Sequence, residues 1–148
     1  MPSPESKSRP VPLPDDLSAG YWAAAAAGRL AIQRCNDCRR WHHPPVVCCP
    51  GCRSRALAFE DVTGRGTVHQ RVVVHQTKLT AFETSTPYVA ATIELDEQPG
   101  LFVVANIVGT APEQVRIGNR VRVIFERIAD GVMLPQFTPD HGATGAPS

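Results

Sequence analysis

The chain has 148 residues, a formal net charge of +1 and five cysteines; charged residues make up 20% of it and hydrophobic residues 43%, which is typical of a soluble globular protein. No apolar run approaches the roughly 18 residues that span a bilayer, and the N-terminus has no apolar signal core, so we expect a cytoplasmic protein without a membrane partner. The near-neutral charge provides no global field that would attract nucleic acid.

The first part of the chain combines a polar arm with one short helix. Residues 1–14 carry repeated prolines and serines, which predicts a disordered arm. The alanine-rich stretch Ala23–Ala27 favours a helix, with Ser18 or a preceding aspartate as its cap and Gly28 as its end. A helix this short is marginal alone, so we expect it to dock on its own domain or on a partner.

Two Cys-x-x-Cys pairs follow, formed by Cys35 and Cys38 and by Cys49 and Cys52. Zinc accepts a tetrahedron of four thiolates without geometric penalty. Two disulfides or free thiols are the alternatives. Nothing marks the chain for export and its number of cysteines is odd, which argues against disulfides. Four sulfur ligands close the coordination shell, whereas a catalytic zinc keeps one position for water, so we expect a structural Zn²⁺.

We expect that Cys48, His42 and His43, which lie in the same segment, do not bind the metal. Cys48 lies beside Cys49, but only Cys49 keeps the two-residue gap to Cys52, so Cys48 is predicted to be packed and inert, with a reactive thiol as the alternative. His42 and His43 are ligands only if one cysteine is disengaged, because four sulfurs leave no vacancy. We expect both histidines to be surface or packing residues.

After Leu57 the apolar pattern changes to a period of two, which predicts five strands over Gly66–His75, Tyr88–Leu95, Leu101–Val108, Arg120–Ile128 and Val132–Phe137. Five short strands suggest a small closed barrel, because closure hides the edges of the sheet. The expected fold is therefore mostly β. We expect a helix and zinc ribbon in residues 15–56, a five-stranded barrel in residues 57–138, and a disordered tail in residues 139–148.

The strand patterns also predict which side chains face the core. The first strand is expected to place Val68, Val72 and Val74 on one face, with His69 and His75 on the other. The third strand is apolar on both faces, as expected of a central strand. The second strand is expected to point four residues inward: Val89, Ala91, Ile93 and Leu95.

A basic segment runs from Arg29 to Arg55 and is opposed only by Asp37. It is a candidate site for phosphates or for an acidic partner, and a solvated surface is the alternative. The candidates for phosphate binding are Arg34, Arg39, Arg40, Arg53 and Arg55. The sequence shows no nucleophile–base–acid arrangement, no phosphate-binding glycine loop and no paired carboxylates on a helix, so no catalytic residue is predicted.

Several short motifs follow one another from about Ala19 to Pro139. They are Tyr21-Trp22, Gly28-Arg29-Leu30, Gln33-Arg34-Cys35, Cys38 with Pro44-Pro45, Cys49-Pro50-x-Cys52, Gly64-x-Gly66-Thr67-Val68, Pro87-Tyr88-Val89, Glu94-Leu95, Ile117-Gly118-x-x-Val121-x-Val123, Asp130-Gly131 and Leu134-Pro135-x-Phe137. In this order and spacing, the chain resembles the bacterial and archaeal acyl-CoA-associated proteins that join a rubredoxin-like zinc ribbon to an OB-fold.

The resemblance implies a non-catalytic accessory subunit. Members of that family act beside thiolases, acyl-CoA synthases, thiolase-like aldolases and MaoC-like hydratases, where the module bridges subunits and lines the channel for the CoA part of a thioester. Carried over, the four cysteines would hold zinc, the helix and ribbon would form the docking surface, and the arginines would lie near CoA phosphates or an acidic partner.

Two other functions remain as alternatives. Zinc ribbons and OB-folds also occur in nucleic-acid-binding modules. Against that reading, aromatic residues make up only 6% of the chain and the strands lack the expected lysines. A stand-alone thioester enzyme would need the catalytic set that the sequence does not show.

Overall fold

The computed structural model describes residues 12–75 and 87–140. Its elements in chain order are α1 (Ala19–Ala26), β1 (Ala31–Cys35), β2 (Trp41–His42), β3 (Leu57–Asp61), β4 (Arg65–Val74), β5 (Tyr88–Leu95), β6 (Phe102–Ile107), η3 (Pro112–Gln114), β7 (Arg120–Ala129) and β8 (Val132–Pro139). Most of the predicted arm and tail lie outside the described residues. Among the described helices, none is long and apolar enough to cross a membrane.

The helix α1 forms where the alanines predict it, although it is only eight residues long. Ser18 is its N-cap, and the Ser18 and Asp15 residues exchange two hydrogen bonds just before it: the Ser18 N–H donates to the Asp15 carboxylate at 2.7 Å, and the Asp15 N–H donates to the Ser18 hydroxyl at 3.1 Å. Gly28 follows the helix with a φ of 78°, a left-handed conformation that favours glycine.

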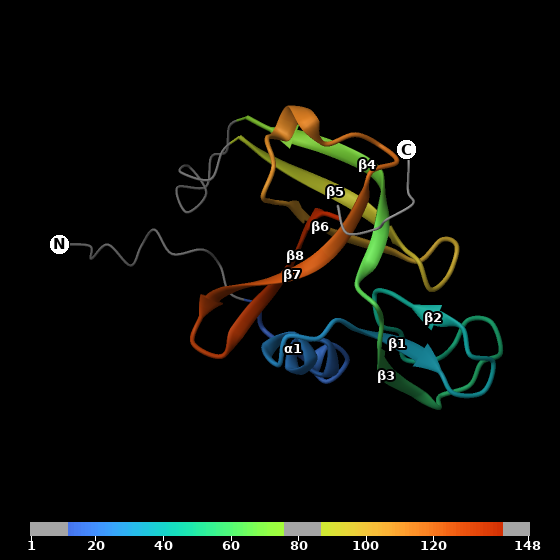
Figure 1. Ribbon diagram of the computed structural model, residues 1–148. Helices are drawn as coiled ribbons and strands as arrows, with labels where there is room; N and C mark the ends of the chain where they lie inside the picture. Colours follow the sequence, from blue (N-terminus) through green and yellow to red (C-terminus); the bar gives the residue numbers. More distant parts are fainter. Residues whose placement is uncertain (1–11, 76–86, 141–148) are drawn as a thin grey trace.

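The strands β1, β2 and β3 form an antiparallel sheet in the order β2-β1-β3 beside α1 (Figure 1). β3 pairs with β1 along its whole length, from Ala31↔Asp61 to Cys35↔Leu57. Residues 57–61, which the sequence assigns to the barrel domain, therefore form part of the ribbon sheet. The chain enters the barrel only after Asp61.

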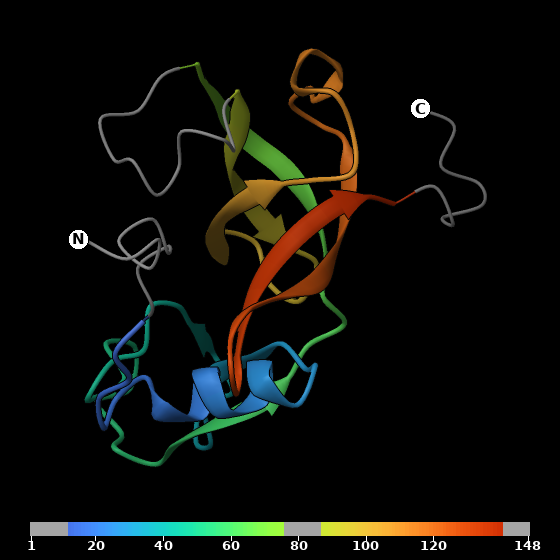
Figure 2. The ribbon, with the colours of Figure 1, turned by 90° about the vertical axis from the view of Figure 1, so that its left-hand side faces the viewer.

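The other five strands form a closed barrel in the order β4-β5-β6-β8-β7, which confirms the predicted mostly β fold and five-stranded barrel. The short 3₁₀ turn η3 lies between β6 and β7. The barrel closes weakly at one place, because β6 and β8 run parallel and pair only at Ile107↔Phe137. The start of β8 leaves the barrel and lies beside α1 (Figure 2).

The face predictions hold for β5 and fail for β4. Alternate residues of β5 are buried, as predicted. In β4 the pairing with β5 shifts between Val68 and Gln70, so one extra residue reverses the alternation after that point. Val68 is buried, but Val73 packs against the core and Val72 is 63% exposed. The outer face of β6 is likewise exposed, because Val104 is 76% accessible.

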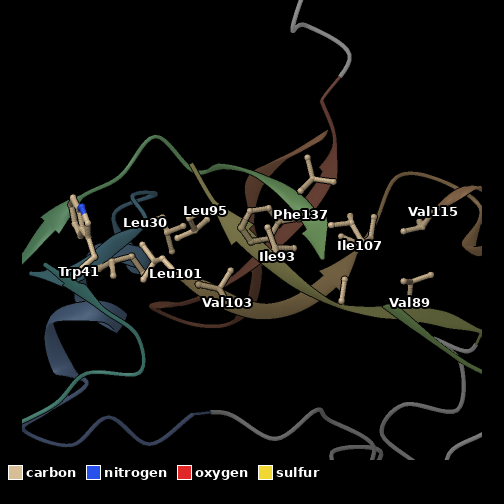
Figure 3. Packing of buried hydrophobic residues seen from close by; sticks show 14 residues of the cluster. Leu30, Trp41, Val89, Ile93, Leu95, Leu101, Val103, Ile107, Val115 and Phe137 are labelled. Atoms are coloured by element: carbon tan, nitrogen blue, oxygen red, sulfur yellow. The ribbon is translucent and has the colours of Figure 1, made fainter. Parts of the chain in front are cut away.

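One apolar core continues from the ribbon into the barrel, and Figure 3 shows it extending from Trp41 and Leu30 past Leu101 to Val89 at the far end. A pair of hydrogen bonds reinforces this junction. The side-chain amide of Gln98, in the β5–β6 turn, accepts from the Trp41 N–H at 3.0 Å and donates to the Trp41 carbonyl at 3.1 Å. The ribbon and the barrel are therefore packed as one unit in the described residues.

Candidate metal centre and docking surfaces

The two Cys-x-x-Cys pairs lie on equivalent turns. The Arg39 N–H donates to the Cys35 carbonyl at 2.9 Å, and the Arg53 N–H donates to the Cys49 carbonyl at 2.7 Å. Both arginines directly follow the second cysteine of a pair and have positive φ angles, 66° for Arg39 and 65° for Arg53. Such a conformation is unfavourable for a non-glycine residue, so two matching instances indicate that the surrounding turns impose it.

These turns bring four sulfur atoms to one point. The Sγ atoms of Cys35 and Cys52 are 3.5 Å apart, those of Cys38 and Cys49 are 3.6 Å apart, and all four lie within 4.8 Å of one another. A tetrahedron with Zn–S bonds of about 2.3 Å has sulfur–sulfur edges of about 3.8 Å. The sulfur cluster therefore fits one tetrahedral zinc ion.

The backbone favours the thiolate form that binds metal. The Cys38 N–H points at the Cys35 sulfur at 3.5 Å, and this hydrogen bond lowers the pKa of Cys35 to about 6. The N–H of Cys52 lowers the pKa of Cys49 in the same way. Because the thiolate is the metal ligand, these amides prepare Cys35 and Cys49 for binding. At Cys52 the hydrogen bond from the Ser54 backbone is outweighed by the neighbouring sulfurs, which raise the pKa to about 12.

His42 contacts the sulfur cluster, a role that the sequence analysis missed. Its ring is buried, and its Nε2 lies 3.3 Å from the Cys49 sulfur. Burial, together with the nearby charge of Arg40, lowers the pKa of His42. A thiolate only accepts, so Nε2 is assigned as the donor. No spacing signal identifies this contact; the short pairing of β2 with β1 creates it.

The other two residues of this segment, Cys48 and His43, lie away from the sulfur cluster. Cys48 is half-buried, and its Sγ donates to the Arg53 carbonyl at 3.2 Å. His43 is half-buried, and its ring lies 5.5 Å from the Tyr21 ring of α1. Of the two roles expected for His43, surface or packing, this contact indicates packing, and it links the ribbon to the helix.

The five candidate arginines divide into two groups. Arg34 lies over the Trp41 ring at 4.5 Å and faces Glu60 at 3.6 Å, while Arg39 approaches the same carboxylate at 3.1 Å. Glu60 therefore partly neutralises these two. The other three are exposed and form no ion pair within the described residues: Arg40, Arg53 and Arg55. Two of the five candidates therefore already have an acidic partner within the chain.

An apolar hollow of about 290 Å³ lies between α1 and the turn that joins β7 to β8. Its lining includes the ring of Trp22, the small side chains of Ala19 and Ala23, and Val132 and Met133 of β8. Hollows of this kind receive apolar groups of ligands or partners. It lies next to the helix that the resemblance implies as a docking element.

A four-cysteine ribbon packed on a five-stranded barrel defines a zinc-ribbon and OB-fold protein. The family model described as "ChsH2, rubredoxin-like zinc ribbon domain" matches residues 22–58, and "ChsH2, C-terminal OB-fold domain" matches residues 59–126. The chain belongs to this ChsH2 (DUF35) family, which confirms the resemblance drawn from its motifs.

Individual relatives agree with this assignment. The chain is 38% identical over 131 residues to a "Probable enoyl-CoA hydratase alpha subunit" of Thermomonospora curvata, covering 88% of this chain and 40% of that relative's length. It is 39% identical over 99 residues to a "DUF35 domain-containing scaffold protein" of Methanocaldococcus jannaschii, covering 66% of this chain and 67% of that protein. The chain thus spans less than half of the hydratase subunit.

A solved structure has the same fold. The chain matches one named "Ltp2-ChsH2(DUF35) aldolase" with a TM-score of 0.79 and 38% sequence identity, covering 86% of this chain and 98% of that one. A DUF35 protein from Sulfolobus solfataricus, at 12% identity and a TM-score of 0.58, shares the fold.

Proposed function

We propose that this chain is a non-catalytic accessory subunit that docks on an acyl-CoA enzyme, either thiolase-like, a thiolase-like aldolase or a MaoC-like hydratase, and helps to form its acyl-CoA site. The observation that carries the proposal is the match to the chain of the Ltp2-ChsH2(DUF35) aldolase, which extends over 98% of that chain. The scaffold and hydratase-subunit names of other relatives support the same class of role.

In this proposal, Cys35, Cys38, Cys49 and Cys52 hold a structural Zn²⁺. The sulfur cluster supplies four ligands at tetrahedral spacing, so it offers no position for a substrate. The metal would supply folding free energy, about 10–16 kcal/mol apparent for comparable structural sites. The role of the ribbon is then to hold α1 and the two Cys-x-x-Cys turns in a fixed position against the barrel.

Two surfaces support docking and CoA contact. The apolar hollow beside α1 offers a place for an apolar group of the enzyme subunit. Arg40, Arg53 and Arg55 are exposed and carry charge that Glu60 does not neutralise, so they are better placed for CoA phosphates than Arg34 and Arg39.

The decisive experiment is co-expression of the chain with the products of its neighbouring genes, followed by co-purification and an aldolase, thiolase or hydratase assay. We expect a stable complex whose turnover depends on this chain, and about one zinc per chain. An Arg40→Ala/Arg53→Ala/Arg55→Ala variant should keep the complex but raise the KM for acyl-CoA, with Arg29→Ala as the control for loss of a positive charge. Recovery of the chain alone, with no effect on any partner's rate, would refute the proposal.

The nucleic-acid alternative has its own readout. Salt-sensitive binding to single-stranded oligonucleotides in the absence of any enzyme partner would support it over the subunit role.

A further inference from the structure

Among the described residues, the edge of strand β6 that faces away from β5 pairs with another strand only at Ile107↔Phe137. The Leu95 N–H donates to the Leu101 carbonyl at 2.8 Å, which fixes the phase of the β5–β6 ladder. Because hydrogen-bonded and non-bonded pairs alternate, the pairs Thr92↔Val104 and Glu94↔Phe102 are non-bonded. The backbone N–H and C=O groups of Phe102 and Val104 therefore point away from β5, toward β8. We call these four groups the β6 edge.

The neighbouring strand does not satisfy the β6 edge. Within the described residues β8 pairs with β6 only at Ile107↔Phe137, and its first residues lie beside α1 instead. Asn106, two residues after Val104, faces the same edge, and there a side chain replaces the missing strand pairing. The Asn106 N–H donates to the side-chain Oε1 of Gln136 at 3.2 Å. No comparable side-chain bond to Phe102 or Val104 occurs in the part of the chain that the structure describes.

Soluble proteins normally protect such an edge with a charge, a proline or a bulge. Strand β6 has none of these, since its sequence from Phe102 to Ile107 is FVVANI. Val104 also points outward with 76% of its surface exposed, and Val72 on β4 is 63% exposed across the same shallow hollow. Ala90 and Thr92 of β5 lie between them. Unpaired backbone groups beside an apolar surface are the features that an added strand recognises.

We propose that an extended segment of the enzyme subunit adds to β6 as a further strand, bonding to Phe102 and Val104 and placing an apolar side chain beside Val104. This inference rests on the proposed function and deepens it, because it names the surface and the conformation of the partner segment. Among the described residues that line the hollow, Arg71 is the only charged one, so this surface suits an apolar polypeptide rather than a phosphate backbone.

The length of the edge argues against a second copy of this chain as the occupant. Two free residues per protomer would bury far less than the roughly 1,200 Å² of a stable interface. An enzyme subunit that already contacts α1 and the ribbon needs only a small additional contact here. The added strand would then set the orientation of the barrel on the enzyme.

The test uses the complex recovered by co-purification. Val104→Lys places a charge on the apolar surface, and Val104→Pro removes the free N–H without touching the β5 ladder. Ile117→Lys is the matched control, because Ile117 is 68% exposed on the β6–β7 connection. We expect both Val104 variants to weaken binding of the enzyme subunit by about tenfold or more and the control to bind as the wild type does.

Amide hydrogen exchange on the labelled wild-type chain gives a second readout, which does not depend on whether a variant folds correctly. The Phe102 and Val104 amides should exchange rapidly in the free chain and at least about tenfold more slowly in the complex. Unchanged exchange at both amides, or wild-type affinity in both Val104 variants, would overturn the strand addition while leaving the accessory-subunit role intact. A dimer of the isolated chain that Val104→Lys dissociates would also overturn it. Failure of the wild-type chain to bind any enzyme would remove both proposals.

Discussion

Gln98 is the residue whose substitution best tests whether the ribbon and the barrel are held together as one unit. It bonds to both backbone groups of Trp41, at 3.0 and 3.1 Å, across 57 positions of sequence. Each neutral hydrogen bond contributes about 1 kcal/mol net, and a buried backbone group left unpaired costs about 1–3 kcal/mol. Because Trp41 is 93% buried in the shared core, Gln98→Ala should lower the free energy of unfolding by about 2–4 kcal/mol.

Denaturant unfolding of the zinc-loaded chain measures that change, and amide exchange at Trp41 locates it. Gln114→Ala is the matched control, because Gln114 is exposed on η3 and its side chain, among the described residues, accepts one hydrogen bond, from the Thr110 hydroxyl at 3.3 Å. The control should stay within about 0.5 kcal/mol of the wild type. A Gln98→Ala chain equally close to the wild type, with an unchanged Trp41 amide, would show that apolar packing alone holds the two parts together.

Two further pairs of variants test the metal site and the barrel. Cys49→Ser should lose the bound zinc and unfold the ribbon, whereas Cys48→Ser should keep about one zinc per chain, because only the Cys49 sulfur belongs to the cluster. Metal analysis measures the zinc content of both variants, and circular dichroism measures their folding. Gly66→Ala should destabilise the barrel by about 1–3 kcal/mol in thermal melts, since the new Cβ would lie 2.5 Å from the Glu94 carbonyl oxygen. Gly51→Ala, with its nearest contact at 3.5 Å, should be close to neutral.

The features that sequence reasoning predicted are those with a short-range chemical signature. The spacing of the four cysteines is set by the ligand geometry of one metal ion, so the metal site can be predicted from the sequence without knowledge of the fold. The alternation of β5 is legible because each inward residue is apolar and none is inserted. The helix is legible from its alanines and its following glycine.

The bulge in β4 shows why the buried face of this strand could not be predicted from the sequence. The run Val72-Val73-Val74 is apolar at every position, so it fits either face and does not reveal the extra residue between Val68 and Gln70. The pairing with β5 decides which valines are buried, and that choice leaves Val72 exposed. The contact of His42 with Cys49 is hidden for a similar reason, since it follows from the register of a two-residue strand.

Within the described residues, three glutamine side chains take the place of ladder hydrogen bonds between strands. Gln33 accepts from the Val46 N–H at 2.7 Å and donates to its carbonyl at 2.9 Å, and Gln98 makes the same two bonds to Trp41. Gln136 accepts from the Asn106 N–H where β6 and β8 diverge. A primary amide offers a donor and an acceptor as a peptide group does, so it completes pairing where the chain is too short to add a strand. By this logic Phe102 and Val104, which no glutamine reaches in the described residues, are the positions where an external strand has bonds to form.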